Sequence, residues 1–122
     1  MEIIIPINPV TKKNHGNIVT IKGRTFMLPS KQYVEYEKKC KQFVPKLESP
    51  IDYPINLKVL YYMETKRKCD ITNLLQATCD MLVKYKVISD DNYSIVESVD
   101  GTKVQYDKEN PRCEIYIEKK ND

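Results

Sequence analysis

The sequence predicts a small α+β domain in which a mixed or antiparallel sheet is accompanied by two main helices. Short apolar and β-rich runs alternate with two segments of helical periodicity, and no internal repeat or low-complexity tract interrupts them. A chain of 122 residues with 41% hydrophobic content is sufficient for one modest core. We therefore expect a single domain over residues 1–122.

The N-terminal half predicts a strand, a hairpin and a surface helix. Runs of apolar and β-branched residues bounded by Pro or Gly are typical of strands. Ser30 is a good N-cap because its hydroxyl accepts a backbone N–H, and the many charges after it favour a surface position. The expected elements are a strand at 2–6, a hairpin formed by 17–23 and 24–28, and a helix from Ser30 to about Phe43.

The C-terminal half predicts a central strand at 56–64, a helix that Asp70 caps, and two further antiparallel strands at 94–105 and 112–119. Within the helix the apolar spacing predicts a buried stripe. That stripe consists of Ile71, Leu74, Leu75, Thr78 and Leu82, and a second face carries Asn73, Gln76 and Asp80.

Overall charge and cysteine content say little about function. The chain has 20 Lys and Arg against 17 Asp and Glu, so a net charge of +3 does not by itself indicate nucleic acid. The four cysteines form no C-x-x-C pair, which argues against a structural zinc site. Without a signal-like leader or an apolar run of spanning length, we expect a cytoplasmic protein with reduced thiols.

The stretch from residue 66 to residue 91 carries the chemistry. A basic triplet (Lys66, Arg67 and Lys68) precedes Asp70, and the acid pair Asp90 and Asp91 follows the helix. Lys and Arg bind phosphates, while carboxylates hold a divalent cation against one of them. The pattern therefore predicts phosphodiester chemistry on nucleic acid.

The same stretch, KRKCDITNLLQATCDMLVKYKVISDDN, resembles the central signature of the RusA family of Holliday-junction resolvases. The family pattern is roughly a basic run, D-x-D-N-L-x-K, D-x-L and a D-D pair. The matching residues are Asp70, Asn73, Leu74, Asp80, Leu82, Asp90 and Asp91. Two positions depart from it, since Thr72 replaces the usual second Asp and Gln76 replaces the usual Lys.

The resemblance implies a RusA-like fold and a metal-dependent endonuclease that cuts branched DNA at four-way junctions during recombination and repair. A junction has pseudo-two-fold symmetry, so two related nicks call for a C2 homodimer. The expected cofactor is Mg²⁺, with Mn²⁺ as an alternative. In this reading Asp70 and Asp91 hold the metal, Asp90 and Asn73 support them, and the basic triplet grips DNA, with Lys12, Lys13 and Asn14 as a second contact surface.

Helical spacing separates Asp80 from Asp70 by about 15 Å, so we expect Asp80 to play a supporting role. Asp91, on the loop after the helix, is expected to return to the N-terminus of the helix. At an extended strand-to-helix junction, residues 70 and 72 would point the same way. Thr72 then leaves the metal one carboxylate short, unless a water, the phosphate oxygens, Asp90 or another acid such as Glu97 completes the shell. Gln76 removes a cation that could neutralise the transition state.

Two other functions remain open. A catalytically weakened relative could bind branched DNA without cutting it efficiently, because Thr72 and Gln76 are both uncharged. A protein-binding phage accessory domain would accommodate the surface charge but would leave the acidic motif unexplained. Incubation with a synthetic junction, with and without metal, separates the enzyme from the binder.

Overall fold

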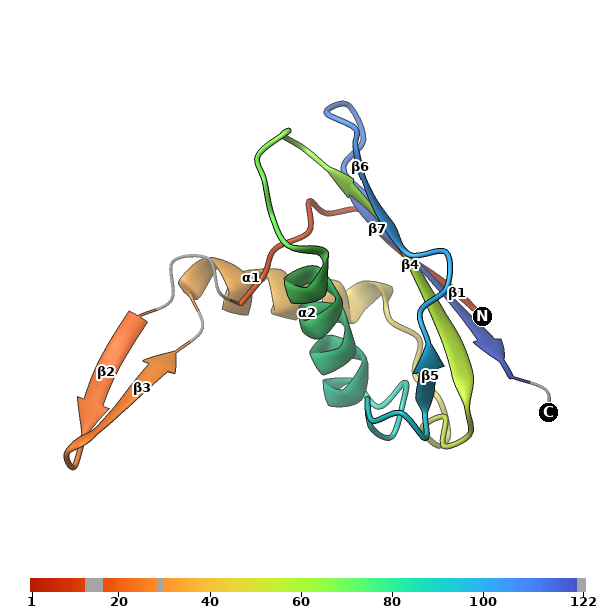
Figure 1. The fold of residues 1–122 in the computed structure, drawn as a ribbon, viewed down its shortest axis with the longest axis horizontal. Coiled ribbons are helices and arrows are strands. Elements are labelled where there is room, and N and C mark those ends of the chain that lie inside the picture. The colour runs from red at the N-terminus through yellow and green to blue at the C-terminus, as the bar shows by residue number, and fades with distance from the viewer. Residues whose placement is uncertain (13–16, 29, 121–122) are drawn as a thin grey trace.

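A computed structural model describes residues 1–12, 17–28 and 30–120, with two helices against one face of a mixed sheet and a separate hairpin (Figure 1). In chain order the elements are β1 (Glu2–Ile5), β2 (Asn17–Ile21), β3 (Arg24–Leu28), α1 (Lys31–Cys40), the 3-10 turn η1 (Lys41–Phe43), β4 (Ile55–Met63), α2 (Ile71–Lys84), β5 (Val96–Ser98), β6 (Lys103–Tyr106) and β7 (Arg112–Lys119). The predicted α+β class is confirmed.

The main sheet is built around β4. On one side β4 pairs antiparallel with β7, which pairs antiparallel with β1. On its other side β4 pairs with β5 near its beginning and with β6 near its end, both in parallel. The predicted first strand, hairpin and central strand are therefore confirmed.

The expectation of one antiparallel strand at 94–105 was wrong. Two short strands stand there, and both run parallel to β4, because α2 crosses the sheet and returns the chain to the beginning of β4. Gly101 interrupts the edge with a φ of 88°. The Asn56 side chain spans this interruption, accepting hydrogen bonds from Ser98 Oγ at 2.5 Å and from the backbone N–H of Asp100 at 2.9 Å.

The core lies between the sheet and the helices. Alternate residues of β1, β4 and β7 face it, as the period of two requires. From α2, the predicted Leu74, Thr78 and Leu82 are buried, but Ile71 is 38% exposed, so the stripe begins one turn later than expected. Ala77, Cys79 and Met81 are also buried. Among the described residues no helix is long and apolar enough to span a membrane.

Helix α1 begins where the sequence predicts. Ser30 Oγ accepts the backbone N–H of Tyr33 at 3.1 Å, and the 3-10 turn η1 ends at Phe43. The expectation that this charged helix is simply a surface element was incomplete, because Tyr33, Glu37 and Cys40 are buried. These three side chains attach α1 to the rest of the domain.

Candidate active site

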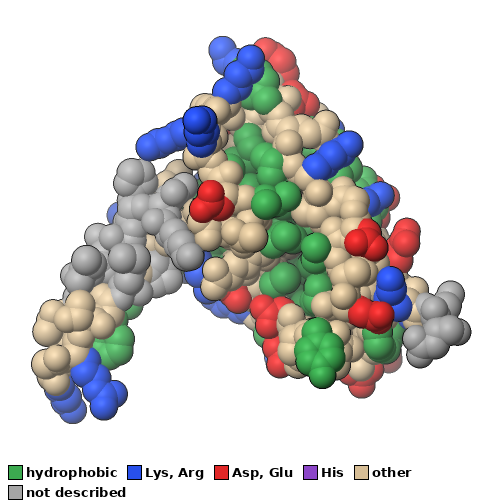
Figure 2. All heavy atoms as spheres, in the orientation of Figure 1, with side chains coloured by type: hydrophobic (Ala, Val, Ile, Leu, Met, Phe, Trp, Pro, Cys, Tyr) green, Lys and Arg blue, Asp and Glu red, His purple; other side chains and the backbone are tan. Residues whose placement is uncertain are grey.

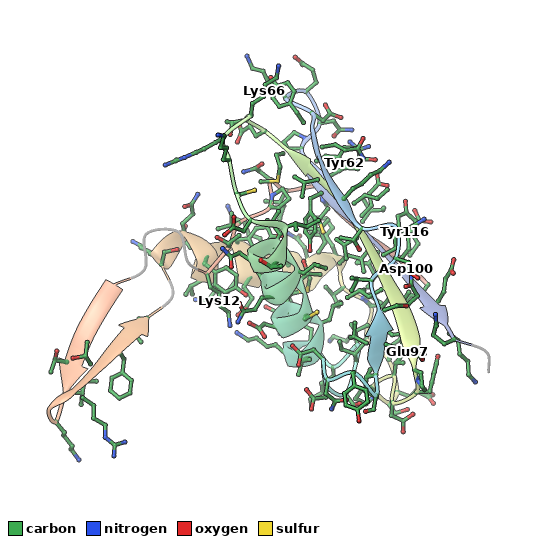
Figure 3. The ribbon with its side chains drawn as sticks, in the orientation of Figure 1. Lys12, Tyr62, Lys66, Glu97, Asp100 and Tyr116 are labelled. Atoms are coloured by element: carbon green, nitrogen blue, oxygen red, sulfur yellow. The ribbon has the colours of Figure 1, made fainter. Side chains whose placement is uncertain are left out.

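The loop between β4 and α2 presents the basic triplet to solvent. All three side chains are exposed, as is every residue from 64 to 70. Lys66 Nζ lies 5.1 Å from the centre of the Tyr106 ring (Figure 3). Arg67 and Lys68 line an open groove of about 300 Å³. Its other lining residues are Asn8, Pro9, Val10, Gln32, Met63, Glu64, Thr65 and Cys69.

Asp70 occupies the N-cap position of α2, with an extended backbone (φ −84°, ψ 128°). Its carboxylate makes no capping hydrogen bond, contrary to expectation, and instead accepts the Asn73 side-chain amide at 3.4 Å. The carboxylate is therefore exposed, lightly held and adjacent to the positive end of a helix. These are suitable conditions for an oxygen ligand to a cation.

Thr72 does not share a direction with Asp70 as an extended chain would require. Helix α2 begins at Ile71, so Thr72 lies in its first turn and successive side chains rotate by about 100°. Both Thr72 and Gln76 are exposed, whereas Asn73 is half-buried. Contrary to expectation, residues 70 and 72 therefore do not lie together on an extended segment, although Thr72 and Gln76 both face solvent.

Asp80 is held by an ion pair that the sequence analysis missed. Lys12 Nζ lies 2.8 Å from Asp80 Oδ2, at the root of the β2–β3 hairpin (Figure 3). Lys12 also lies over the Tyr33 ring, with Nζ 5.6 Å from its centre. Lys12, predicted to contact DNA, thus forms a partly exposed ion pair with Asp80, and its DNA contact stays a prediction. Lys13 and Asn14 lie outside the described residues.

Asp90 and Asp91 lie on the loop after α2 and are both exposed. Asp90 accepts the backbone N–H of Asp91 at 2.7 Å and the Asn92 amide at 3.0 Å, and these bonds hold the pKa of Asp90 below its usual value. Partial burial raises the pKa of Asp91, and the hydrogen bond and charge of Asp90 and the charge of Asp80 raise it further. A cation beside Asp91 would relieve this repulsion.

The acidic residues lie at different places along α2. Asp70 is at the N-terminus of the helix, whereas Asp91, on the loop after the helix, lies close enough to Asp80 for the charge of Asp80 to raise its pKa. In residues 1–12, 17–28 and 30–120, no three His, Cys, Asp or Glu side chains are grouped to hold a metal ion. The return of Asp91 to the helix N-terminus and the metal roles of Asp70 and Asp91 stay predictions.

Sequence reasoning also missed a partly buried cluster that joins the two helices. Glu37 accepts the Tyr33 hydroxyl at 2.9 Å and Lys84 Nζ at 2.5 Å. Tyr85 donates its hydroxyl to the Glu37 carbonyl at 2.7 Å. The i, i+4 spacing of Tyr33 and Glu37 was the only local signal for it.

Basic side chains gather at two places on one face of the molecule. Figure 2 shows Lys and Arg over the loop after β4 and again at the tip of the hairpin. A larger cavity of about 450 Å³ lies elsewhere, and both acids and Lys residues line it. Its walls are Asn56, Lys58, Asp100, Gly101, Glu118, Lys119 and Lys120, so its mixed charge makes it a poor phosphate site.

An α+β fold that presents exposed carboxylates beside a basic loop defines a candidate nuclease of nucleic acids. The family model described as Endodeoxyribonuclease RusA matches residues 6–118, which is nearly the whole chain. The protein therefore belongs to the RusA family, and membership implies a Holliday-junction resolvase that acts on branched DNA. Nucleases of this family are generally dependent on divalent metal. A comparison with individual curated proteins found no match.

Proposed function

We propose that this protein is a cytoplasmic, metal-dependent endodeoxyribonuclease that resolves Holliday junctions by paired phosphodiester hydrolysis in DNA recombination and repair. The family match over residues 6–118 is the observation that carries the proposal. The exposed carboxylate of Asp70 beside the basic triplet supports it, because this is the arrangement that cutting a polyanion needs.

In this proposal some residues bind DNA and others take part in hydrolysis. The basic triplet holds the phosphate backbone in the groove beside Asp70. Asp70 and Asp91 hold Mg²⁺ or Mn²⁺, which when bound polarises the phosphate and lowers the pKa of an attacking water. Asp90 positions Asp91 by accepting its backbone N–H, and the Asn73 amide orients the Asp70 carboxylate.

The positions of the two acids favour a homodimer with shared sites. Asp70 stands at the N-terminus of α2, whereas Asp91 lies on the loop after the helix, near Asp80, and Mg²⁺ ligands lie only about 2.1 Å from the ion. In a C2 dimer, Asp70 of one chain and the partner's Asp91 belong to the same site. The two resulting sites are related by the same symmetry as the two strands to be cut.

The first experiment incubates the protein with a synthetic four-way junction and a linear duplex of equal length, with Mg²⁺, with Mn²⁺ or with EDTA. We expect metal-dependent paired nicks in the junction alone. Asp70→Asn should abolish the nicks yet leave junction binding intact or tighter, because it removes a ligand and one negative charge. Undiminished cutting by Asp70→Asn would contradict the site.

The second experiment tests whether the sites are shared. Asp70→Asn and Asp91→Asn proteins are inactive alone, but a mixed dimer has one site that retains both carboxylates. Mixing the two variants should restore single nicks if the sites are shared. If mixed dimers form and no nick returns, each chain holds its own site and the shared arrangement is wrong.

The second candidate function is a branched-DNA-binding protein of the same fold that cuts slowly or not at all. It is favoured by Thr72 and Gln76, which leave the exposed first turns of α2 without the acid and the base of the family pattern. The junction assay separates the candidates, because this protein would bind the junction equally well in Mg²⁺ and in EDTA and leave it uncut.

A further inference from the structure

The β2–β3 hairpin stands apart from the body of the domain (Figure 1). Its strands pair antiparallel with each other and with no other strand among the described residues. Five extended residues per strand give the hairpin a reach of about 17 Å. An isolated two-stranded hairpin is only marginally stable in water, so an unpartnered one is expected to have something to dock against.

One face of this hairpin is apolar and open to solvent. The exposed fractions are 58% for Ile21, 44% for Phe26 and 48% for Leu28. The register pairs Ile21 with Arg24 and places Phe26 and Leu28 on the same face, since they lie two and four residues after Arg24. The hairpin therefore presents three apolar side chains and one guanidinium together.

The charge of the segment indicates the chemistry of the partner. Residues 3–34 contain no Asp or Glu, although acids are common in the rest of the chain. The same segment contains five Lys and Arg residues, namely Lys12, Lys13, Lys22, Arg24 and Lys31. A surface of this charge attracts a polyanion, and it opposes a second copy of itself.

At the tip of the hairpin, Lys22 adopts a backbone conformation that is unfavourable for a residue other than glycine. Lys22 has a φ of 51° and Gly23 a φ of 76°, which is the two-residue type I′ geometry. Asn followed by Gly is the preferred sequence for this turn, and a side chain such as that of Lys is strained there. Lys22 therefore holds its cation at the tip of the hairpin in spite of the backbone strain.

The root of the hairpin is fixed to the body near the acids. Lys12 forms its ion pair with Asp80 just before the hairpin, and Ser30 caps α1 just after it. Asn8, Pro9 and Val10 before the hairpin and Gln32 after it line the same groove as Arg67 and Lys68. The hairpin is therefore an arm that starts beside the candidate active site.

We propose that this hairpin is a DNA-contacting arm that seats on the branch point of the junction. Lys22 and Arg24 bind phosphates, and Phe26, flanked by Ile21 and Leu28, packs on bases that lose a stacking neighbour where strands exchange. Intact duplex offers no such base face, so the arm contributes selectivity for branched DNA. This inference rests on the proposed function.

The charge at the tip is tested with Lys22→Asn, which creates the favoured Asn-Gly turn while removing a cation. Lys86→Asn is the matched control, because Lys86 is also exposed with a φ of 61° but lies in the turn after α2. Junction binding is measured in EDTA over a range of salt. Lys22→Asn combined with Arg24→Gln should reduce the log–log salt slope by about 1.8, and Lys86→Asn should leave it unchanged.

The apolar face is tested with Phe26→Thr, which removes the ring but places a β-branched residue of high strand propensity in β3. We expect the preference for junction over duplex to fall about fivefold or more, and a 2-aminopurine at the branch point to lose the fluorescence change that wild type induces. The proposal that the hairpin contacts DNA would be overturned if Phe26→Thr left the junction preference and the fluorescence change as in wild type. An unchanged salt slope in the Lys22→Asn, Arg24→Gln variant would also overturn it. Dissociation of a dimer by Phe26→Thr with normal DNA binding would show that the face packs on a second copy instead.

These experiments also separate the arm from the proposed function. Wild-type protein that does not distinguish junction from duplex contradicts both. If wild-type protein prefers the junction and the hairpin variants behave as wild type, only the proposal that the hairpin contacts DNA is contradicted. Circular dichroism of each variant checks that the domain remains folded.

Discussion

The hydrogen bond between Tyr61 of β4 and Thr78 of α2 should couple the helix to the sheet. The two hydroxyl oxygens lie 2.6 Å apart, and Thr78 Oγ1 lies 3.0 Å from the Leu74 carbonyl. Thr78 has a single hydroxyl proton, which it donates to that carbonyl. Tyr61 must therefore be the donor to Thr78, and this is the only bond its proton makes.

The two ends of this bond should be unequal in energy. Tyr61 is 1% exposed and Thr78 is 5% exposed, so water cannot replace a lost partner. Thr78→Val leaves a buried phenolic O–H without an acceptor and should cost about 2–3 kcal/mol of unfolding free energy. Tyr61→Phe leaves the Thr78 proton bonded and should cost about 1 kcal/mol. The double variant leaves no orphaned group, so its cost should fall about 1 kcal/mol short of the sum.

Urea unfolding followed by circular dichroism and tyrosine fluorescence measures all three free energies, and the absence of tryptophan leaves the nine tyrosines as the emitters. Tyr93→Phe is the control, because Tyr93 is 88% exposed and should be neutral. The result that refutes this reasoning is additivity of the two single costs within about 0.3 kcal/mol. Additivity would mean that Tyr61 finds another partner or that the bond contributes nothing.

Three further predictions concern binding, metal and acid stability. Replacing the basic triplet with Ala should lower the salt slope of DNA binding by up to about 2.7, and an unchanged slope would place the DNA elsewhere. Thr72→Asp adds an acid to the first turn of α2, which has none, so it should stabilise the helix by about 0.3–1 kcal/mol. It should also allow cleavage at lower Mg²⁺ concentration, because a carboxylate binds the ion better than a hydroxyl. A metal titration in which the variant needs as much Mg²⁺ as wild type, or more, contradicts the idea that the metal lacks one carboxylate ligand. Hydrogen bonds from Tyr116 and Arg112 lower the pKa of Glu114 below its ordinary 4.5. The stabilisation that they provide is therefore fully present above pH 4.5 and is lost as the pH falls through the lowered pKa. Urea unfolding at several pH values should therefore show Glu114→Gln closest to wild type in acid, and a constant difference would contradict the assignment.

The features that were predictable from sequence are the ones that local chemistry controls. Ser30 caps its helix as expected because the hydroxyl and the N–H that it accepts are three residues apart. The hairpin was readable from two β-rich runs around Gly23. For Asp70, the N-cap position was predicted but its hydrogen bond was not, because the carboxylate points to the Asn73 amide instead.

The sequence predicts which residues make up the candidate site but not how they are arranged. The family pattern selects Asp70 and Asp91 by their types and spacing alone, and their metal roles stay predictions. The folded chain places Asp91 on the loop after α2, close enough to Asp80 for the charge of Asp80 to raise its pKa. Lys12 likewise looked like a free cation, and only the folded chain places it against Asp80.

The sequence by itself determined the class of fold, the order of its main elements and the family, because strand and helix periods, caps and short motifs are written in neighbouring residues. Only the tertiary structure decided which ends of those elements meet. It buries Glu37 against Lys84, which lies 47 residues further along the chain, and it leaves the hairpin's apolar face without a cover. Such contacts depend on how the whole chain closes around one core, so no local pattern specifies them.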